Sequence, residues 1–497
     1  MINSTKLYIY YFFRNRVKYN LTIRHNNLIL VIISTKTLGY KMKKYSIVIL
    51  TILFSTQIFA QVDHSEFFDD NYDTPQDITA ACLDCHEGVG KEILHTRHWN
   101  WMALEGSKST IGKKNLINNF CIATSSNLPR CTSCHIGYGW KDNSFDFTDE
   151  KNIDCLVCHD QSGTYIKIPT GAGAVDEKVD LVKVAQSVGL TTRKNCGTCH
   201  FDGGGGAGVK HGDMDNSLYN PTKEIDVHMG GEGFQCTECH ATTEHKIAGA
   251  SHGSMEVGEN MVSCLDCHDA EVHTKGILNK HIAAVACETC HIPTFAREMP
   301  TKMWWDWSEA GKDIIDKKDK YGESTYNKMK GSFVWEKNVI PTYAWYNGTA
   351  EYYHIGDKID ASNVVELNKL NGSVGDKNAK IAPFKVMKGK QPYDSENNYM
   401  IVPHLFGKKG YWNTYDWKEA SEIGMESVKL EFSGSVGFVE TEMSWPINHM
   451  VAPAENALKC MACHGKKSED RLDWKALGYS GDPLRAGGRV QNNLLKN

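Results

Sequence analysis

The sequence lacks the features that would hold it in a membrane or on nucleic acid. Its apolar run near the start, residues 46–60, is too short for a comfortable membrane span. Beyond it there is no excess of positive charge, because residues 61–497 contain 46 Lys and Arg against 60 Asp and Glu, a net charge of −14. We therefore expect no binding to nucleic acid or anionic lipid, and a basic protein as the natural electrostatic partner.

Acidic residues are also missing from residues 1–41, which hold seven Lys or Arg. From Met42 the sequence MKKYSIVILTILFSTQIFAQ has two lysines, an apolar run and the small residue Ala60, the pattern of a secretory signal peptide. We therefore interpret residues 1–60 as a doubtful leader plus a signal peptide, with the true start at Met42 and cleavage near Ala60. The expected location is periplasmic, with no stable membrane span after cleavage. A basic anchor in residues 1–41 is the alternative.

Of the 17 cysteines, Cys121 alone lies outside a Cys-x-x-Cys-His motif. The motif occurs eight times, where chance would give about 0.02 at this composition. Its thiols attach a c-type haem and its histidine becomes an axial iron ligand, whereas zinc, the alternative for a lone Cys-x-x-Cys pair, gives no reason for the histidine. We predict eight covalently bound haems, attached at Cys82 and Cys85, Cys131 and Cys134, Cys155 and Cys158, Cys196 and Cys199, Cys236 and Cys239, Cys264 and Cys267, Cys287 and Cys290, and Cys460 and Cys463, with His86, His135, His159, His200, His240, His268, His291 and His464 on the irons.

Strand signals are nearly absent from the stretch that holds the first seven motifs. The intervals between these motifs are too short to build apolar cores of their own, so the porphyrins must supply the core. The predicted fold is mainly α with long loops and little β, a multihaem cytochrome c whose core is formed by stacked haems. We expect a haem-dense domain with seven haems at 61–291, an aromatic-rich, haem-free lobe at 292–459 whose Trp and Tyr pack on haem faces, and the eighth haem with a C-terminal tail at 460–497.

The second axial ligand of each iron decides its role. Two strong ligands make an electron carrier, whereas an open or displaceable position permits chemistry. Of the 13 histidines outside the motifs, His25 and His64 are set aside because they lie too near the start. Seven others lie close to haem motifs, which leaves one of the eight irons for another ligand. The predicted distal ligands are His98, His228, His245, His252, His273, His281 and His449, with His95, His211, His354 and His404 in reserve.

Four consecutive glycines, Gly203–Gly206, follow the fourth motif and lead to Lys210. The stretch lacks the spacing of a phosphate-binding loop. Glycine lets a backbone approach a flat macrocycle closely, and a desolvated lysine can bind iron as a neutral amine. A flexible linker with a solvated lysine is the alternative.

The segments GGGGAGVKHGD (203–213) and NNFCIATSSNLPRCTSCHIGYGW (118–140) resemble the octahaem tetrathionate reductases, a family of bacterial periplasmic cytochromes. The resemblance covers essentially the whole chain after the signal peptide. It implies that the haem on the second motif, with His135, is the active site and that its distal ligand is Lys210. It also implies that Cys121 lies beside the reactive iron, where a thiolate could attack a sulfur–sulfur bond. A buried structural cysteine or an intermolecular disulfide are the alternatives for Cys121.

The chain departs from the family at Ala207, where the family carries an acidic residue. Asp213 or Asp215 could take its place as a proton donor.

The sequence thus predicts a periplasmic reductase. Electrons would come from a basic partner cytochrome or a quinol-oxidising system and pass through seven bis-histidine haems to the haem bound by Lys210. The substrate would be a small inorganic anion or nitrogen compound: tetrathionate, reduced to thiosulfate, or nitrite or hydroxylamine. Two alternatives are an electron-transfer or storage cytochrome without catalysis, and an oxidase resembling hydroxylamine oxidoreductase.

Overall fold

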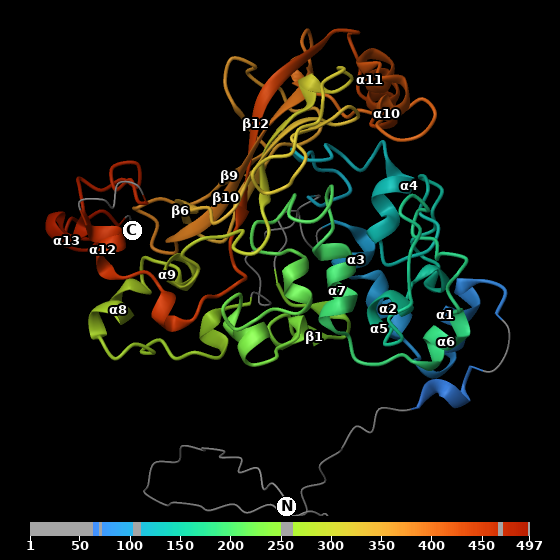
Figure 1. Ribbon diagram of the computed structural model, residues 1–497, viewed down its shortest axis with the longest axis horizontal. Coiled ribbons are helices and arrows are strands. Elements are labelled where there is room, and N and C mark those ends of the chain that lie inside the picture. Colours follow the sequence, from blue (N-terminus) through green and yellow to red (C-terminus); the bar gives the residue numbers. More distant parts are fainter. Residues whose placement is uncertain (1–62, 69–71, 103–110, 250–261, 466–470, 496–497) are drawn as a thin grey trace, which may run out of the picture. The chain divides into compact units, whose positions relative to one another are not determined.

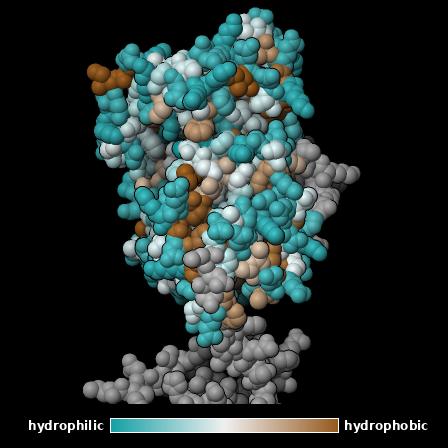
Figure 2. Space-filling view, turned by 90° about the vertical axis from the view of Figure 1, so that its right-hand side faces the viewer, coloured by the Kyte–Doolittle hydropathy of each residue, from teal (hydrophilic) through white to brown (hydrophobic). Residues whose placement is uncertain are grey.

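The computed structural model describes residues 63–68, 72–102, 111–249, 262–465 and 471–495. The predicted leader and signal peptide lie outside these ranges, and so does His252. Within them, no helix has the length and apolarity that a bilayer crossing requires. The face that carries α1 (Pro75–Cys85), α6 (Leu181–Gln186) and α10 (Tyr411–Thr414) is predominantly hydrophilic, interrupted by smaller apolar areas (Figure 2).

The region that carries the first seven motifs consists of short helices joined by long loops (Figure 1). The longest, α1, begins at a capping box formed by Thr74 and Asp77, with Pro75 in its first turn. Each of the eight motifs lies wholly or partly on a helix or a single helical turn. The further elements that carry or flank them are α2 (Val89–Leu94), α3 (Arg97–Asn100), α4 (Leu128–Cys131), α5 (Leu156–His159), α7 (Arg193–His200), η6 (Cys236–Glu238), η7 (Cys264–Asp266), α8 (Gly276–His281), α9 (Cys287–His291) and α12 (Cys460–His464).

The lobe after the seventh motif is built on an eight-stranded sheet, so the prediction of little β is wrong here. The strands run in the order β4-β5-β3-β10-β12-β8, and β6 and β11 also pair with β10. The long strands β10 and β12 pair antiparallel along eleven residues, and Figure 1 shows them rising above the short helices. The sheet strands are β3 (Thr301–Asp306), β4 (Tyr326–Asn327), β5 (Gly331–Glu336), β6 (Thr342–Tyr346), β8 (Val365–Glu366), β10 (Lys380–Asp394), β11 (Tyr399–Met400) and β12 (Val436–Pro446); β7 (Ala350–Tyr352) and β9 (Asn368–Leu370) form a separate pair.

The sequence of β10 lacks the usual alternation of apolar and polar residues because this strand buries polar side chains. Lys385, Gln391 and Asp394 are each 0% exposed, so hydrophobic alternation cannot be seen in the sequence of this strand. Burial of a polar group without a partner is costly, and each of the three is hydrogen-bonded.

The lobe supplies most of a large side-chain core, to which the segments around Phe120 and Val209 also contribute. Trp305 and Trp307 are fully buried and stack with ring centroids 5.0 Å apart. Met387 and Met443 belong to the same cluster, against which α11 (Trp417–Ser427) packs through Met425. The tryptophans expected to cover haem faces thus include two that lie inside the lobe instead.

One buried lysine joins the sheet to the loop that carries Lys210. The Lys385 ammonium donates to the carbonyl oxygens of Val209 at 2.7 Å and Lys210 at 3.1 Å, and to Oγ1 of Thr301 at 2.6 Å. Thr301 in turn donates from Oγ1 to the carbonyl of Gly208 at 2.7 Å. The start of β3 and the middle of β10 therefore hold the main chain on either side of Lys210.

Candidate haem sites and reaction centre

Six motif histidines each face a second imidazole at nearly the same distance. Two imidazoles bound about 2 Å from one metal place their ring centres about 6 Å apart. The observed centroid separations of 6.1 to 6.4 Å therefore fit one iron between the two rings of each pair. In the described part of the chain no group of three or more His, Cys, Asp or Glu gathers as a metal cluster. The pairs are His64 with His86, His98 with His200, His228 with His268, His240 with His449, His273 with His291, and His281 with His464.

Five of the seven histidines predicted as distal ligands stand in these pairs. A sixth, His245, bonds Glu92 through Nδ1 at 2.9 Å. Burial lowers the pKa of His159, the motif histidine of the third site, and the charge of His245 adds to that effect. The seventh, His252, lies outside the described residues.

His64, which the sequence argument set aside, lies opposite His86. It begins a short helical turn whose first N–H groups are capped by Asp63, which accepts from the Ser65 amide at 2.9 Å. The stretch Asp-His-Ser is the local signal that could have identified it. Of the reserve histidines, Nδ1 of His404 lies 2.7 Å from the Ser126 carbonyl and Nδ1 of His354 lies 3.4 Å from Asp357.

The thiols show which motifs are neighbours in space. Four pairs from different motifs are within hydrogen-bonding reach of each other, and three further pairs are close enough for their charges to interact. Together they connect the motifs in the order one, three, four, five, six, seven, eight, with the second motif joined to the fourth. The four closer pairs are Cys82 with Cys155, Cys134 with Cys199, Cys196 with Cys236 and Cys264 with Cys287; the three others are Cys158 with Cys196, Cys239 with Cys267 and Cys290 with Cys463.

His135, on the second motif, has different surroundings from the six paired rings. Its Nε2 lies 2.7 Å from the carbonyl oxygen of Trp99, so this nitrogen donates a proton to the oxygen. The residue is 1% exposed, and burial lowers the pKa of its ring to about 3. The sequence argument placed this ring on the iron, whereas in this conformation its Nε2 is engaged by a backbone carbonyl. Five aromatic rings surround it with centroids 4.8 to 6.1 Å away, those of Trp99, Trp101, Trp140, Phe145 and Phe147.

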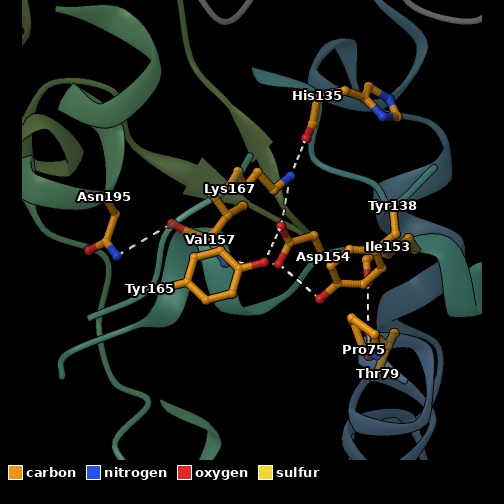
Figure 3. A network of polar contacts seen from close by, with 10 residues as sticks. All are labelled: Pro75, Thr79, His135, Tyr138, Ile153, Asp154, Val157, Tyr165, Lys167 and Asn195. Atoms are coloured by element: carbon orange, nitrogen blue, oxygen red, sulfur yellow. Dashed lines mark hydrogen bonds and ion pairs between the residues drawn. The ribbon is translucent and has the colours of Figure 1, made fainter. Parts of the chain in front are cut away.

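A buried ionic network fixes the main chain of His135 (Figure 3). Lys167 donates to the His135 carbonyl at 2.6 Å and pairs with Oδ2 of Asp154 at 2.7 Å. Asp154 accepts further bonds from the hydroxyls of Tyr138 at 3.0 Å and Tyr165 at 2.8 Å. Since Asp154 directly precedes the third motif, the network ties the second motif to the third and restricts the His135 peptide.

The glycine run brings the Lys210 loop against the segment around Cys121. Gly204, Gly205 and Gly206 have φ of 74°, 112° and 122°, a region that side chains rarely adopt. A Cβ on Gly204 would lie 2.8 Å from the ring of Phe120. The structure thus shows a close approach of this backbone to the loop that carries Phe120, and the predicted approach to a macrocycle stays a prediction.

Lys210 carries a buried amine beside the second motif. Burial lowers its pKa to about 8, and its Nζ lies 4.9 Å from the ring centroid of Trp445. Its positive charge also acts on the thiol of Cys134, one of the two attachment cysteines of the second motif. Lys167, whose charge also acts on Cys134, is engaged by Asp154 and the His135 carbonyl. Iron ligation by Lys210 stays a prediction.

Cys121 lies between the Lys210 loop and the second motif. Its Sγ is 3.5 Å from the point that a Cβ of Gly205 would occupy, and its charge acts on the thiol of Cys131. Burial raises the pKa of Cys121, against the opposing charges of nearby lysines. The thiol is therefore protonated and a weak nucleophile in this state.

Two carboxylates, Asp213 and Asp215, were considered as replacements for the acidic residue that is missing at Ala207. Both already accept hydrogen bonds. Asp213 accepts bonds from the amides of Asn448 at 2.7 Å and His449 at 2.9 Å, and from Nδ1 of His449 at 3.1 Å. It thereby orients one of the paired imidazoles. Asp215 caps a helical turn by accepting from the Ser217 amide at 2.8 Å.

Comparison with known proteins gives matches along most of the chain. Residues 302–467 match the family described as bacterial cytochrome c, residues 222–292 that of cytochrome c7 and related cytochrome c, and residues 81–160 that of cytochrome c554 and c-prime. The crystal structure of an octahaem cytochrome c from Shewanella oneidensis is 50% identical with a TM-score of 0.81, and the match covers 85% of this chain and 98% of that one. An uncharacterized protein of Archaeoglobus fulgidus is 25% identical over 38% of this chain and 81% of its own.

Proposed function

This chain belongs to the octahaem c-type cytochromes, and from that premise we propose that it is an exported reductase of small sulfur or nitrogen compounds. Its reaction centre would be the haem attached at Cys131 and Cys134, with Lys210 as an iron ligand. When bound, that haem supplies an iron that can bind a substrate and pass electrons to it. The other seven sites would relay electrons between histidine pairs.

The observation that carries the proposal is the contrast between the second site and the paired sites. Six motif histidines face another imidazole, whereas His135 is held by the Trp99 carbonyl inside an aromatic box. Where the paired sites offer a second imidazole, the fold here offers a buried amine, Lys210, whose pKa burial lowers to about 8, so that less free energy is needed to reach the neutral form that can bind a metal. This position, without a second imidazole, would be the one open to exchange with a substrate.

The surroundings of Cys121 favour an anion as substrate. The positive charges that act on its thiol come from Lys330, Lys302, Arg130 and Lys113. Tetrathionate carries two negative charges, and two electrons split its central sulfur–sulfur bond to give two thiosulfates. The Cys121 thiol would lie beside that bond, while Trp445 and Phe120 exclude water from the same place.

The order of the motifs supports a relay that ends at the second site. The seven other motifs form a continuous series, and the second joins that series at the fourth. Electrons entering at either end of the series would therefore reach the reaction centre through the haem at Cys196 and Cys199. With a net charge of −14 beyond residue 60, the donor that docks at such an end would be basic.

The direct test is turnover by the reduced holoprotein with tetrathionate, nitrite and hydroxylamine. Lys210→Met should lower turnover at least 100-fold for the preferred substrate, whereas Lys194→Met, at an exposed lysine on α7, should leave it unchanged. Cys121→Ser should lower tetrathionate turnover more than hydroxylamine turnover. A wild-type protein that stays reduced with all three substrates would instead be an electron carrier.

A further inference from the structure

Lys302, on β3, is a buried lysine without an anionic partner. The residue is 3% exposed, and its Nζ lies 3.2 Å from the ring centroid of Phe333, 4.0 Å from that of Trp305 and 4.8 Å from that of Trp335. Among the described residues the structure records no hydrogen bond or ion pair for this ammonium. Contacts with aromatic faces offset part of the cost of burying a cation, and the remainder favours the uncharged form. Burial accordingly lowers the pKa of Lys302 well below its usual value.

One of the aromatic rings around the Lys302 ammonium, that of Trp305, also borders the Cys121 site. A Cβ on Gly205 would lie 3.4 Å from Cζ3 of Trp305 and 3.5 Å from Sγ of Cys121. The ring of Trp305 therefore has the Lys302 ammonium over it and the glycine loop with Cys121 at its edge. The amide of Lys302 also donates to the carbonyl of Gly208 at 3.0 Å, which fixes this strand against the loop that carries Lys210.

The charges around Lys302 are unbalanced. Lys330 and Lys385 both lower its pKa further after burial, whereas Cys121 and Glu323 raise it. Cys121 is a protonated thiol, so of the groups named only Glu323 is a carboxylate that acts against the two lysines. An anion entering the Cys121 site would supply the missing negative charge, favour the protonated form of Lys302, and accept a desolvated, charge-assisted hydrogen bond from its ammonium.

We propose that Lys302 is the anion anchor of the reaction centre, a positioning and specificity-determining residue whose ammonium binds a terminal oxyanion of the substrate. This inference rests on the proposed function, because it places the substrate between Lys302 and the Lys210 haem, next to Cys121. The substrate class is a small inorganic oxyanion such as tetrathionate, thiosulfate or nitrite. Neutral hydroxylamine gains nothing from this group, so Lys302 separates anionic from neutral substrates.

Two variants of the holoprotein test the anchor. Lys302→Met removes the charge at similar length, and Lys302→Arg keeps a charge in a larger head group. Lys328→Met, at an exposed lysine paired with Asp313, is the matched control. The first readout is binding of thiosulfate to the oxidised protein by titration calorimetry, which requires no turnover. We expect at least tenfold weaker binding for Lys302→Met and no change for the control.

The second readout is steady-state kinetics. Lys302→Met should raise KM for tetrathionate at least tenfold and change kcat/KM for hydroxylamine less than threefold. Unchanged thiosulfate binding, or equal losses with both substrates, would overturn the anchor. If Lys302→Met does not accumulate as holoprotein, Lys302→Arg carries the test, since its displaced charge must alter thiosulfate affinity and leave hydroxylamine turnover in place.

The two proposals fail separately. If wild-type protein binds thiosulfate through Lys302 but reduces no substrate, the anchor stands and the reductase does not. If wild-type protein reduces tetrathionate and Lys302→Met does so with the same KM, the reductase stands and the anchor does not.

Discussion

The haem-bearing region and the sheet lobe bury their side chains in different ways. The largest apolar clusters of the region before residue 292 are small; one of them consists of Phe68, Ile78, Leu156, Val184 and Ala185. The cluster centred on the lobe contains twenty-four buried residues among those described; nineteen, Trp305 and Met387 included, belong to the lobe, and five come from the region before residue 292. The comparison indicates that the first region depends on its haems for a core, whereas the lobe has a core made of side chains.

The largest expected effect comes from removing the haems. If the full chain is produced without haem attachment, the region 63–292 should lose its fold, while the sheet of the lobe stays protected. Hydrogen exchange measured on the intact chain should show at least 100-fold lower protection for α1 and α7 than for β10 and β12. Equal protection of both regions would show that the short helices do not need the haems.

Within the haem-bearing region, Asp154→Asn should be the most damaging of the point changes considered. It leaves the Lys167 ammonium buried without a counter-charge, at a cost of about 3–5 kcal/mol. Chemical denaturation of the holoprotein measures this loss. If the loss comes from the unpaired Lys167 ammonium, the double variant Asp154→Asn with Lys167→Met should be more stable than Asp154→Asn alone. A double variant whose loss equals the sum of the two single losses would contradict the role of the ion pair.

A matched pair of leucines compares the two cores. Leu405, in the lobe, and Leu156, on the third motif, are each 1% exposed. Leu405→Ala should cost about 3 kcal/mol in both the holoprotein and the haem-free chain. Leu156→Ala should destabilise the holoprotein alone, because its surroundings are already unfolded without haem. An effect of Leu156→Ala on the haem-free chain would weaken the comparison.

The smallest expected change in stability comes from the link between the two regions. Lys385→Met removes the three hydrogen bonds to Val209, Lys210 and Thr301 and should cost about 1–3 kcal/mol. Its larger consequence should be on the second site, because the main chain of Lys210 loses its support. We expect an altered electron paramagnetic resonance signal from that site and unchanged signals from the histidine pairs; a signal identical to wild type would show that Lys385 does not position Lys210.

The sequence predicted the features of the haem-bearing region better than those of the lobe. In the haem-bearing region the chemistry is local: a motif of five residues predicts the attachment, and nearby histidines such as His98 and His449 do lie opposite motif rings. His64 was missed because it lies only a few residues after the predicted cleavage site and was set aside for that position. The sheet of the lobe was missed because Lys385 and Gln391 take buried positions in β10, and their partners come from distant segments that no local pattern identifies.

The position of His135 could not be predicted either. The motif is the same as the other seven, and the difference arises from packing: Trp99 and Trp101 come from one segment, Trp140 and Phe147 from another, and only the fold brings them around one imidazole. The special status of the second site was predicted instead from the count of available histidines and from the family resemblance.

The most direct test of the account is a quantitative electron paramagnetic resonance spectrum of the oxidised holoprotein, alone and as Lys210→Met. The account predicts that seven of the eight irons give signals typical of two imidazole ligands, and that one gives a distinct signal which changes in the variant. Eight equivalent bis-imidazole irons in the wild-type protein, unaffected by the loss of the Lys210 amine, would contradict it.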